Sequence, residues 1–124
     1  MVRLFLADDM PAVREVLRLG LVHRRGFLVV GEAANGVDAL RGIAALAPDV
    51  AILDVDMPGM SGLDVVRQLR LKGDATPVIL CSSGESELAD GLPGIVGRLR
   101  KPFALDRLIR AVDDAASVCM RMQA

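Results

Sequence analysis

The amino-acid sequence predicts an α/β fold, a doubly wound parallel sheet with helices on both faces. Five short and almost uninterrupted apolar runs recur along the chain, and segments with helical periodicity separate them. Continuous apolar strands are typical of sheets buried on both faces, and alternating strands and helices are typical of right-handed crossovers between parallel strands. A third observation is that four of the five runs end in polar residues.

The apolar runs define the expected strands, and capping residues mark where the helices between them begin. Pro11 suits the first turn of a helix. Asn35 and Gly36 open a second helix, and Ser61 followed by Asp64 forms a capping-box pattern for a third. The strands are predicted at residues 2–7, 27–33, 50–55, 77–83 and 96–103.

Apolar residues at helical spacing predict the face that each helix turns toward the sheet. The second helix is expected to end at Pro48. A fourth helix is expected to be shortened or irregular, because Gly91, Pro93 and Gly94 leave at most about two turns after Ser82. The predicted core-facing residues are Val13, Val16, Leu17 and Leu21, then Val37, Leu40, Ile43 and Ala47, then Leu63, Val66 and Leu69, and finally Leu105, Leu108, Val112, Ala116 and Cys119.

Length and composition limit the kind of protein. We expect residues 1–124 to form one domain with a single core. Apolar residues make up 52% of the chain, which argues against disorder, and a formal net charge of -1 argues against nucleic-acid binding. The N-terminal residues turn acidic too early for a secretory signal, and charges interrupt every apolar stretch before it reaches membrane-spanning length. Cys81 and Cys119 lack metal-site spacing, so a cytoplasmic protein with reduced thiols is expected.

The polar residues at the strand ends predict a functional site. Because carboxyl ends of parallel strands meet at one edge of the sheet, Asp8, Asp9, Asp54, Ser82 and Lys101 should converge there. Three carboxylates need a counter-charge, and an oxygen-only ligand set points to Mg²⁺. With a lysine and a hydroxyl alongside, such a cluster suits phosphoryl transfer, in which a carboxylate can be the nucleophile. The chain has no phosphate-binding Gly-rich loop, so no nucleotide is implied.

These motifs, in this order, resemble the receiver domain of two-component response regulators over essentially the whole chain. The matching pieces are the acid pair Asp8-Asp9, the segment "LDVDMPGMSGLD" around Asp54, the hydroxyl of Ser82, and "KPF" beginning at Lys101. The resemblance implies a single-domain, flavodoxin-like (βα)5 fold with a five-stranded parallel sheet in the order 2-1-3-4-5.

The resemblance also implies a phosphorelay switch. Asp54 would accept a phosphoryl group from a phosphohistidine of a sensor histidine kinase or a histidine phosphotransfer protein. Lys101 and Ser82 would each contact a phosphoryl oxygen. The domain would catalyse its own phosphorylation and dephosphorylation and change its binding to a downstream protein target, without contacting nucleic acid or a membrane itself.

The resemblance further implies a Mg²⁺ site in the same cluster. The ligands would be the carboxylates of Asp9 and Asp54 and the backbone carbonyl of Asp56. Asp8 would act mostly through water.

Two other functions are open at this stage. A degenerate receiver would serve as a phosphorylation-independent binding module. A small Mg²⁺-dependent phosphatase would use Asp54 as nucleophile and Asp56 as acid and base. The acid pair could also merely cap the first helix, and Ser82 and Ser83 could be turn residues.

We also expect two surfaces of the domain to contact other proteins, one the phosphodonor and one the downstream target. On the first helix, Arg14 or Arg18 would steer the phosphodonor protein, and an exposed Leu17 or Leu21 would add apolar contact. At the readout surface the sequence departs from the family pattern, because Arg98 stands where receivers usually have an aromatic residue.

Overall fold

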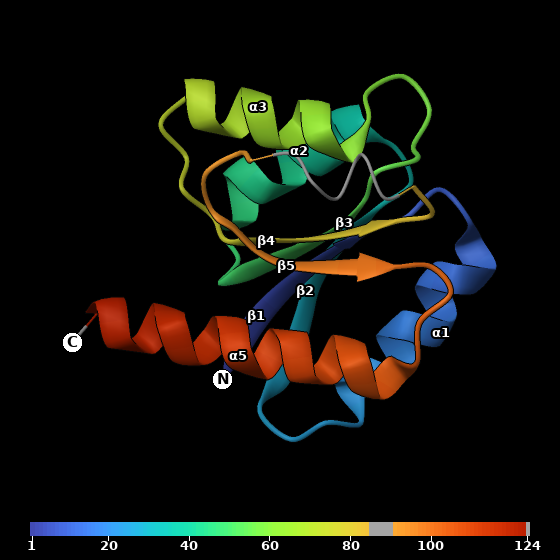
Figure 1. Cartoon of the computed structure of the whole chain (residues 1–124), viewed down its shortest axis with the longest axis vertical. Helices are drawn as coiled ribbons and strands as arrows, with labels where there is room; N and C mark the ends of the chain where they lie inside the picture. The colour runs from blue at the N-terminus through green and yellow to red at the C-terminus, as the bar shows by residue number, and fades with distance from the viewer. Residues whose placement is uncertain (85–90, 124) are drawn as a thin grey trace.

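A computed structural model of the chain describes residues 1–84 and 91–123, with residues 118–123 described by their backbone alone. It shows one five-stranded sheet in the order β2-β1-β3-β4-β5, in which all neighbouring strands are parallel, as predicted. Figure 1 shows α2 and α3 on one face of this sheet and α1 and α5 on the other. The elements are β1 (Val2–Ala7), α1 (Pro11–Val22), β2 (Phe27–Ala33), α2 (Gly36–Leu46), β3 (Val50–Asp54), α3 (Gly62–Leu71), β4 (Val78–Ser82), β5 (Ile95–Arg100) and α5 (Leu105–Gln123).

All three predicted helix starts are confirmed, and those of α2 and α3 have capping hydrogen bonds from side chains, whereas α1 begins at Pro11 without one. The backbone N–H of Asp38 donates to the side chain of Asn35 at 2.8 Å, at the start of α2. At the start of α3, the N–H of Asp64 donates to Ser61 Oγ at 3.2 Å, and the N–H of Ser61 donates to Asp64 Oδ2 at 3.3 Å. These reciprocal bonds satisfy N–H groups that have no partner inside the helix.

The last strand ends earlier than predicted. The apolar run suggested a strand over residues 96–103, whereas β5 spans Ile95–Arg100. The N–H of Lys101 still donates to the carbonyl of Ser82 at 2.8 Å. Pro102 has no N–H to continue the ladder, so the strand stops and Lys101 lies at its exit.

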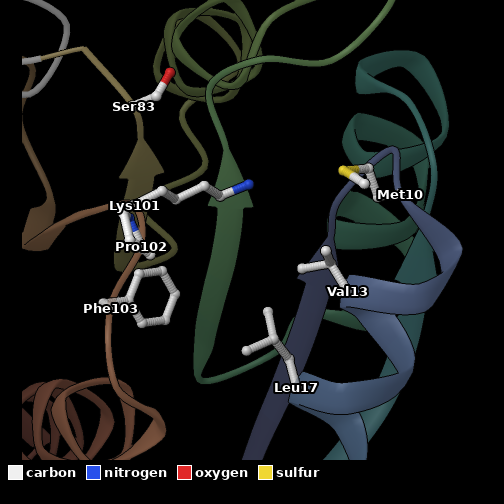
Figure 2. A pocket seen from close by; sticks show the side chains of 7 residues that line it. All are labelled: Met10, Val13, Leu17, Ser83, Lys101, Pro102 and Phe103. Carbon is white, nitrogen blue, oxygen red and sulfur yellow. The ribbon is translucent and has the colours of Figure 1, made fainter.

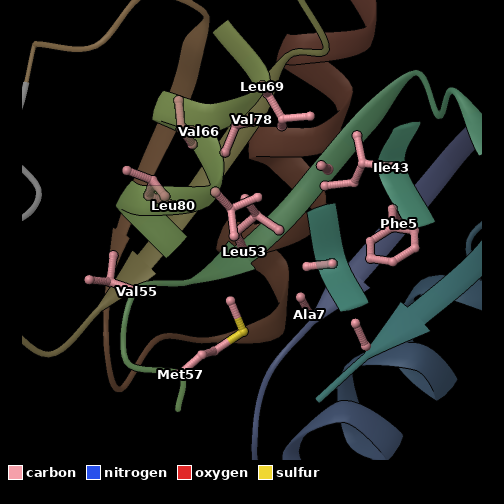
Figure 3. Packing of buried hydrophobic residues seen from close by; sticks show 14 residues of the cluster. Phe5, Ala7, Ile43, Leu53, Val55, Met57, Val66, Leu69, Val78 and Leu80 are labelled. Atoms are coloured by element: carbon pink, nitrogen blue, oxygen red, sulfur yellow. The ribbon is translucent and has the colours of Figure 1, made fainter. Parts of the chain in front are cut away.

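Two apolar layers hold the helices against the sheet. The layer under α2 and α3 includes Leu53 and Leu80 from neighbouring strands and Val66 and Leu69 from α3 (Figure 3). The layer on the opposite face includes Ile52, with residues of α1 and α5. All five residues of β3 are buried, so packing on both faces sets the position of the residue at its end.

Some predicted core positions are wrong. Val16 is 64% exposed, and Val37 and Ala47 are also exposed. Ala39 and Val65 are buried instead. Successive helical residues turn by about 100°, so an apolar residue beside a core position can still face water. The second helix stops before Pro48, as expected, because α2 ends at Leu46 and Ala47 is its C-cap. The side chain of Cys119 lies outside the described part of the chain.

The predicted fourth helix would fall mainly on residues 85–90, which lie outside the described residues. Residues 91–94, just before β5, form no helix. Arg70 of α3 holds this segment, since its Nε donates to the carbonyl of Pro93 at 2.7 Å. Within the described ranges, no helix combines the length and apolar character that a membrane crossing requires.

Gly62 joins the start of α3 to the end of β3. A Cβ on Gly62 would lie 2.5 Å from the backbone carbonyl oxygen of Asp54. We therefore predict that Gly62→Ala lowers the free energy of unfolding by ~1–3 kcal/mol, the usual cost of overpacking. Helix propensity alone would predict the opposite sign. Urea unfolding measures the change.

The matched control is Gly91→Ala. A Cβ on Gly91 would meet no atom of the described residues within 4 Å. This variant should stay within about 0.5 kcal/mol of the parent. If Gly62→Ala proved as stable as the parent, the close contact with Asp54 would not constrain the chain.

Candidate functional site

The predicted polar residues meet at the carboxyl edge of the sheet. Asp8 follows β1, Asp54 ends β3, and both side chains are buried, with 2% and 3% of their surface exposed. Asp9 is exposed beside them. One carboxylate oxygen from each of these three residues lies within 4.8 Å of the other two. The expected convergence of the acid pair with Asp54 is therefore confirmed.

Lys101 reaches across the sheet edge to two of the carboxylates. Its Nζ lies 3.0 Å from Asp8 Oδ2 and 3.0 Å from Asp54 Oδ2. In Figure 2 the Lys101 side chain extends from the segment after β5 toward the end of β3. Its ammonium group compensates two carboxylates that would otherwise be buried without a cation.

Backbone N–H groups hold the second oxygen of each buried carboxylate. The N–H of Met10 donates to Asp8 Oδ1 at 2.9 Å, and the N–H of Asp56 donates to Asp54 Oδ1 at 3.1 Å. Each carboxylate is thus fixed on one side by the backbone and on the other by Lys101. This arrangement sets the orientation of both carboxylate planes.

Burial and charge oppose each other at these groups. Burial raises the pKa of Asp54, and Asp8 raises it further, while hydrogen bonding and charge from Lys101 act in the opposite direction without cancelling the increase. Burial alone would lower the pKa of Lys101, but its hydrogen bonds to Asp8 and Asp54 outweigh burial and raise it. Lys101 is therefore a cation at neutral pH.

The two serines after β4 have different environments. Ser82 is fully buried, and its Oγ accepts a hydrogen bond from the N–H of Gly84 at 3.0 Å. Ser83 is exposed, and its Oγ donates to Asp56 Oδ2 at 3.4 Å. Asp56 is itself exposed, so this contact lies at the surface of the site.

Three further residues do not belong to the acidic cluster. His23 is exposed at the far end of α1. Cys81 is buried, and burial raises the pKa of its thiol to about 12, so it is a small core residue. Arg98, in the position usual for an aromatic residue, is exposed on β5.

The sequence predicted apolar contact beside this cluster from Leu17 or Leu21, but it did not predict a pocket there. An apolar pocket is lined by residues of α1 and of the segment after β5, together with Lys101. Met10 was not predicted as a residue of the site. Its position directly after the acid pair was the signal that could have suggested it. Leu17, expected as a possible surface contact, is buried and lines this pocket, and Leu21 is fully buried.

The donor set of the cluster suits a hard divalent cation. The three grouped residues, Asp8, Asp9 and Asp54, offer carboxylate oxygens, and the group contains neither histidine nor cysteine. Three carboxylates against the one ammonium of Lys101 leave an excess of negative charge. Oxygen ligands with net negative charge are those that Mg²⁺ prefers. A carboxylate, a lysine and a hydroxyl can also bind and receive a phosphoryl group.

The importance of Lys101 to the fold can be measured without any ligand. We predict that Lys101→Met lowers the free energy of unfolding by ~2–3 kcal/mol at pH 7 in a chelating buffer, somewhat less than the ~3–5 kcal/mol for a fully buried pair. Lys101 lowers the pKa that burial raises at Asp54, so in the variant this carboxyl takes up its proton at a higher pH than in the parent. The loss should therefore be largest above the pKa of Asp54 in the variant, and it should shrink as the pH falls from that pKa to the lower parental one.

Lys72→Met is the matched control, since Lys72 is exposed at the end of α3. Its unfolding free energy should be close to that of the parent at each pH. An equal loss in both variants, or a loss independent of pH, would contradict the role assigned to Lys101.

Comparison with known proteins agrees with this geometry. The chain is 44% identical over 111 residues to the response regulator MprA of Mycobacterium ulcerans, covering 87% of this chain and 47% of that protein. It is 33% identical over 119 residues to the chemotaxis protein CheY of Listeria monocytogenes, covering 94% and 99%. The chain thus spans about half of MprA, and 31% of a protein-glutamate methylesterase/protein-glutamine glutaminase of Myxococcus xanthus that it matches at 44% identity.

The similarity extends to solved structures and to a whole-family description. The signal receiver domain of the putative response regulator NarL from Mycobacterium tuberculosis superposes with a TM-score of 0.86 at 37% identity, covering 94% of this chain and 96% of that domain. Residues 4–113 match the family model of the response regulator receiver domain. This chain therefore belongs to the response regulator receiver family.

Proposed function

We propose that this chain is the phosphoacceptor of a two-component phosphorelay and that Asp54 receives the phosphoryl group. The donor is a phosphohistidine on a sensor histidine kinase or a histidine phosphotransfer protein. The observation that supports this most strongly is the pairing of Lys101 Nζ with both Asp54 and Asp8 at 3.0 Å. It places a cation beside the nucleophile, where it can neutralise an incoming phosphoryl oxygen.

The transfer is a displacement at phosphorus. A carboxylate oxygen of Asp54 attacks, the phosphorus–nitrogen bond breaks, and the histidine leaves with the electron pair and takes up a proton. The ammonium of Lys101 moves from pairing with carboxylates to pairing with phosphoryl oxygens. The hydroxyl of Ser82, positioned by the N–H of Gly84, contacts another phosphoryl oxygen.

We infer that Mg²⁺ is the cofactor of this site. Asp9, Asp54 and the backbone carbonyl of Asp56 would hold the ion, and Asp8 would act mostly through water. The excess of carboxylates over cations in the cluster supports this assignment. When bound, the ion neutralises charge on the phosphoryl group as it transfers.

The surface that meets the donor differs from the sequence-based expectation. Leu17 and Leu21 are buried, so neither presents an exposed apolar side chain to a partner protein, and Leu17 contributes only to the wall of the pocket. Arg14 and Arg18 lie 3.7 Å and 3.4 Å from carboxylate oxygens of Glu32, so their charges are partly compensated within the chain. The apolar contact beside the acidic edge is better supplied by exposed Met10.

We further propose that residues 1–124 form a single receiver domain of a cytoplasmic signalling protein. Phosphorylation of Asp54 would change its binding to a downstream protein target. The phosphorylation-independent binding module and the small phosphatase both differ from this proposal in their chemistry, so labelling experiments separate them.

We predict that a small phosphodonor with Mg²⁺ adds one phosphoryl group, at Asp54. Intact-mass measurement should show the adduct, and hydroxylamine should remove it because the product is an acyl phosphate. Asp54→Asn should abolish labelling, while Asp56→Asn, the matched control, should retain it. Labelling of Asp54→Asn at the parental rate would refute the assignment. Sustained turnover of a small phosphate ester would favour the phosphatase.

We also predict that Mg²⁺ raises the melting temperature. At a concentration 100 times Kd, binding to the folded state alone adds about 2.7 kcal/mol. Asp9→Asn should remove most of this rise, because it deletes a carboxylate that the structure does not pair with Lys101. Asp114→Asn, at an exposed position on α5, should keep it. An undiminished rise in Asp9→Asn would mean that the ion binds elsewhere.

A further inference from the structure

An apolar pocket of about 490 Å³ opens beside the ion pairs of Lys101. This volume lies within the range of about 300–1,000 Å³ found for small-molecule sites. Figure 2 shows two walls facing each other, one from the start of α1 and one from the segment between β5 and α5. The side chains forming these walls are Met10, Val13, Leu17, Pro102 and Phe103.

The lining of this pocket favours the uncharged ring or alkyl part of a ligand. Among the described residues, Lys101 is the only charged one that lines it, and its ammonium already lies 3.0 Å from both Asp8 and Asp54. Ser83 adds one hydroxyl. An ionic group would lose hydration against the apolar walls without gaining an unpaired partner, whereas a ring or alkyl group gains from leaving water.

Lys101 belongs to both the acidic cluster and the pocket. Its ammonium contacts Asp54, and its side chain also lines the apolar space. A phosphoryl group held between Asp54 and Lys101 would lie beside the pocket. For an in-line displacement its leaving group stands opposite the attacking Asp54 oxygen, on the open side of the site that the pocket walls border.

We propose that this pocket binds the leaving group of small phosphodonors and makes Asp54 react faster with aromatic acyl phosphates than with compact ones. The inference rests on the proposed phosphoacceptor role of Asp54. With benzoyl phosphate, an Asp54 oxygen forms a bond to phosphorus while the bond from phosphorus to the benzoate oxygen breaks. Benzoate departs with the electron pair, and no proton is transferred.

Met10 and Phe103 are the residues that set this preference. Phe103 is partly buried and packs on the core at the pocket wall, where its ring can lie against the ring of the donor. Met10 is 55% exposed at the opposite wall, and its thioether makes favourable contacts with aromatic rings. These two side chains discriminate a phenyl group from a methyl group.

The test compares benzoyl phosphate with acetyl phosphate at equal Mg²⁺ concentration. The two leaving groups are both carboxylates of similar basicity, so their chemical reactivity is matched. The rate of adduct formation at Asp54, followed by intact mass, gives kcat/KM for each donor. We expect a ratio of about ten in favour of benzoyl phosphate, the effect of burying part of one ring.

Substitutions at the walls should lower this ratio. Met10→Ala and Phe103→Leu should each reduce it about threefold or more, because each removes apolar contact area. Met10→Ala removes an exposed side chain and leaves the core intact. Val16→Ala is the matched control and should leave the ratio unchanged. Val16 lies on α1, as Val13 of the pocket does, but it is 64% exposed and does not line the pocket.

Binding can be followed without chemistry. Phenylphosphonate should shift the methyl NMR signals of Val13 at concentrations where methylphosphonate does not, and Met10→Ala should weaken this response. Suppose that acetyl phosphate labels Asp54 and that kcat/KM for benzoyl phosphate is no higher than for acetyl phosphate, or that neither Met10→Ala nor Phe103→Leu changes the ratio of the two values. Either result would overturn the pocket proposal and leave the phosphoacceptor assignment standing. Absence of any adduct at Asp54 with both donors would overturn the proposed function, and the pocket proposal with it.

Discussion

The ammonium of Lys101, placed between the carboxylates of Asp8 and Asp54, is the interaction on which the site depends. Each buried carboxylate alone would cost several kcal/mol in lost hydration. One cation at 3.0 Å from both compensates that cost and draws the ends of β1 and β3 to the residue after β5. The backbone N–H of Lys101 donates a hydrogen bond to the carbonyl of Ser82, which sets the position of the Lys101 backbone from which its side chain extends.

The ion pairs of Lys101 have the buried strand β3 on one side and a pocket on the other. β3 is buried along its whole length, and the N–H of Asp56 holds the outer oxygen of Asp54. Gly62 allows α3 to start directly against the carbonyl of Asp54. The opposite side has a pocket with apolar walls. Asp54, the proposed nucleophile, is therefore held in place on one side, while the pocket on the other side leaves room for the donor that we propose.

The charge of the cluster explains why it suits phosphoryl transfer. Three carboxylates and one ammonium leave negative charge that a divalent cation can balance. A phosphoryl group brings further negative charge, which the same cations can share. Its hydrogen bonds to Asp8 and Asp54 raise the pKa of Lys101 and keep its ammonium charged, so a cation is in place for the transfer that we propose.

The sequence by itself determined the order of the strands and helices, the caps at Asn35 and Ser61, and the edge of the sheet where the acidic residues meet. These features follow from short-range patterns, because apolar runs, capping residues and strand ends act over a few neighbouring positions. The parallel topology then follows from the alternation of the elements. Asp8, Asp54 and Lys101 could therefore be placed at one edge from the sequence.

Only the tertiary structure decided which side chains pair or pack across that edge. The burial of Leu17 and the exposure of Val16 depend on how α1 rotates against the sheet, which helical periodicity leaves open within about one residue. The pocket between Met10 and Phe103 depends on the spacing of two segments far apart in the chain. Such long-range distances are set by the packing of the whole core, and a local pattern of residues does not contain them.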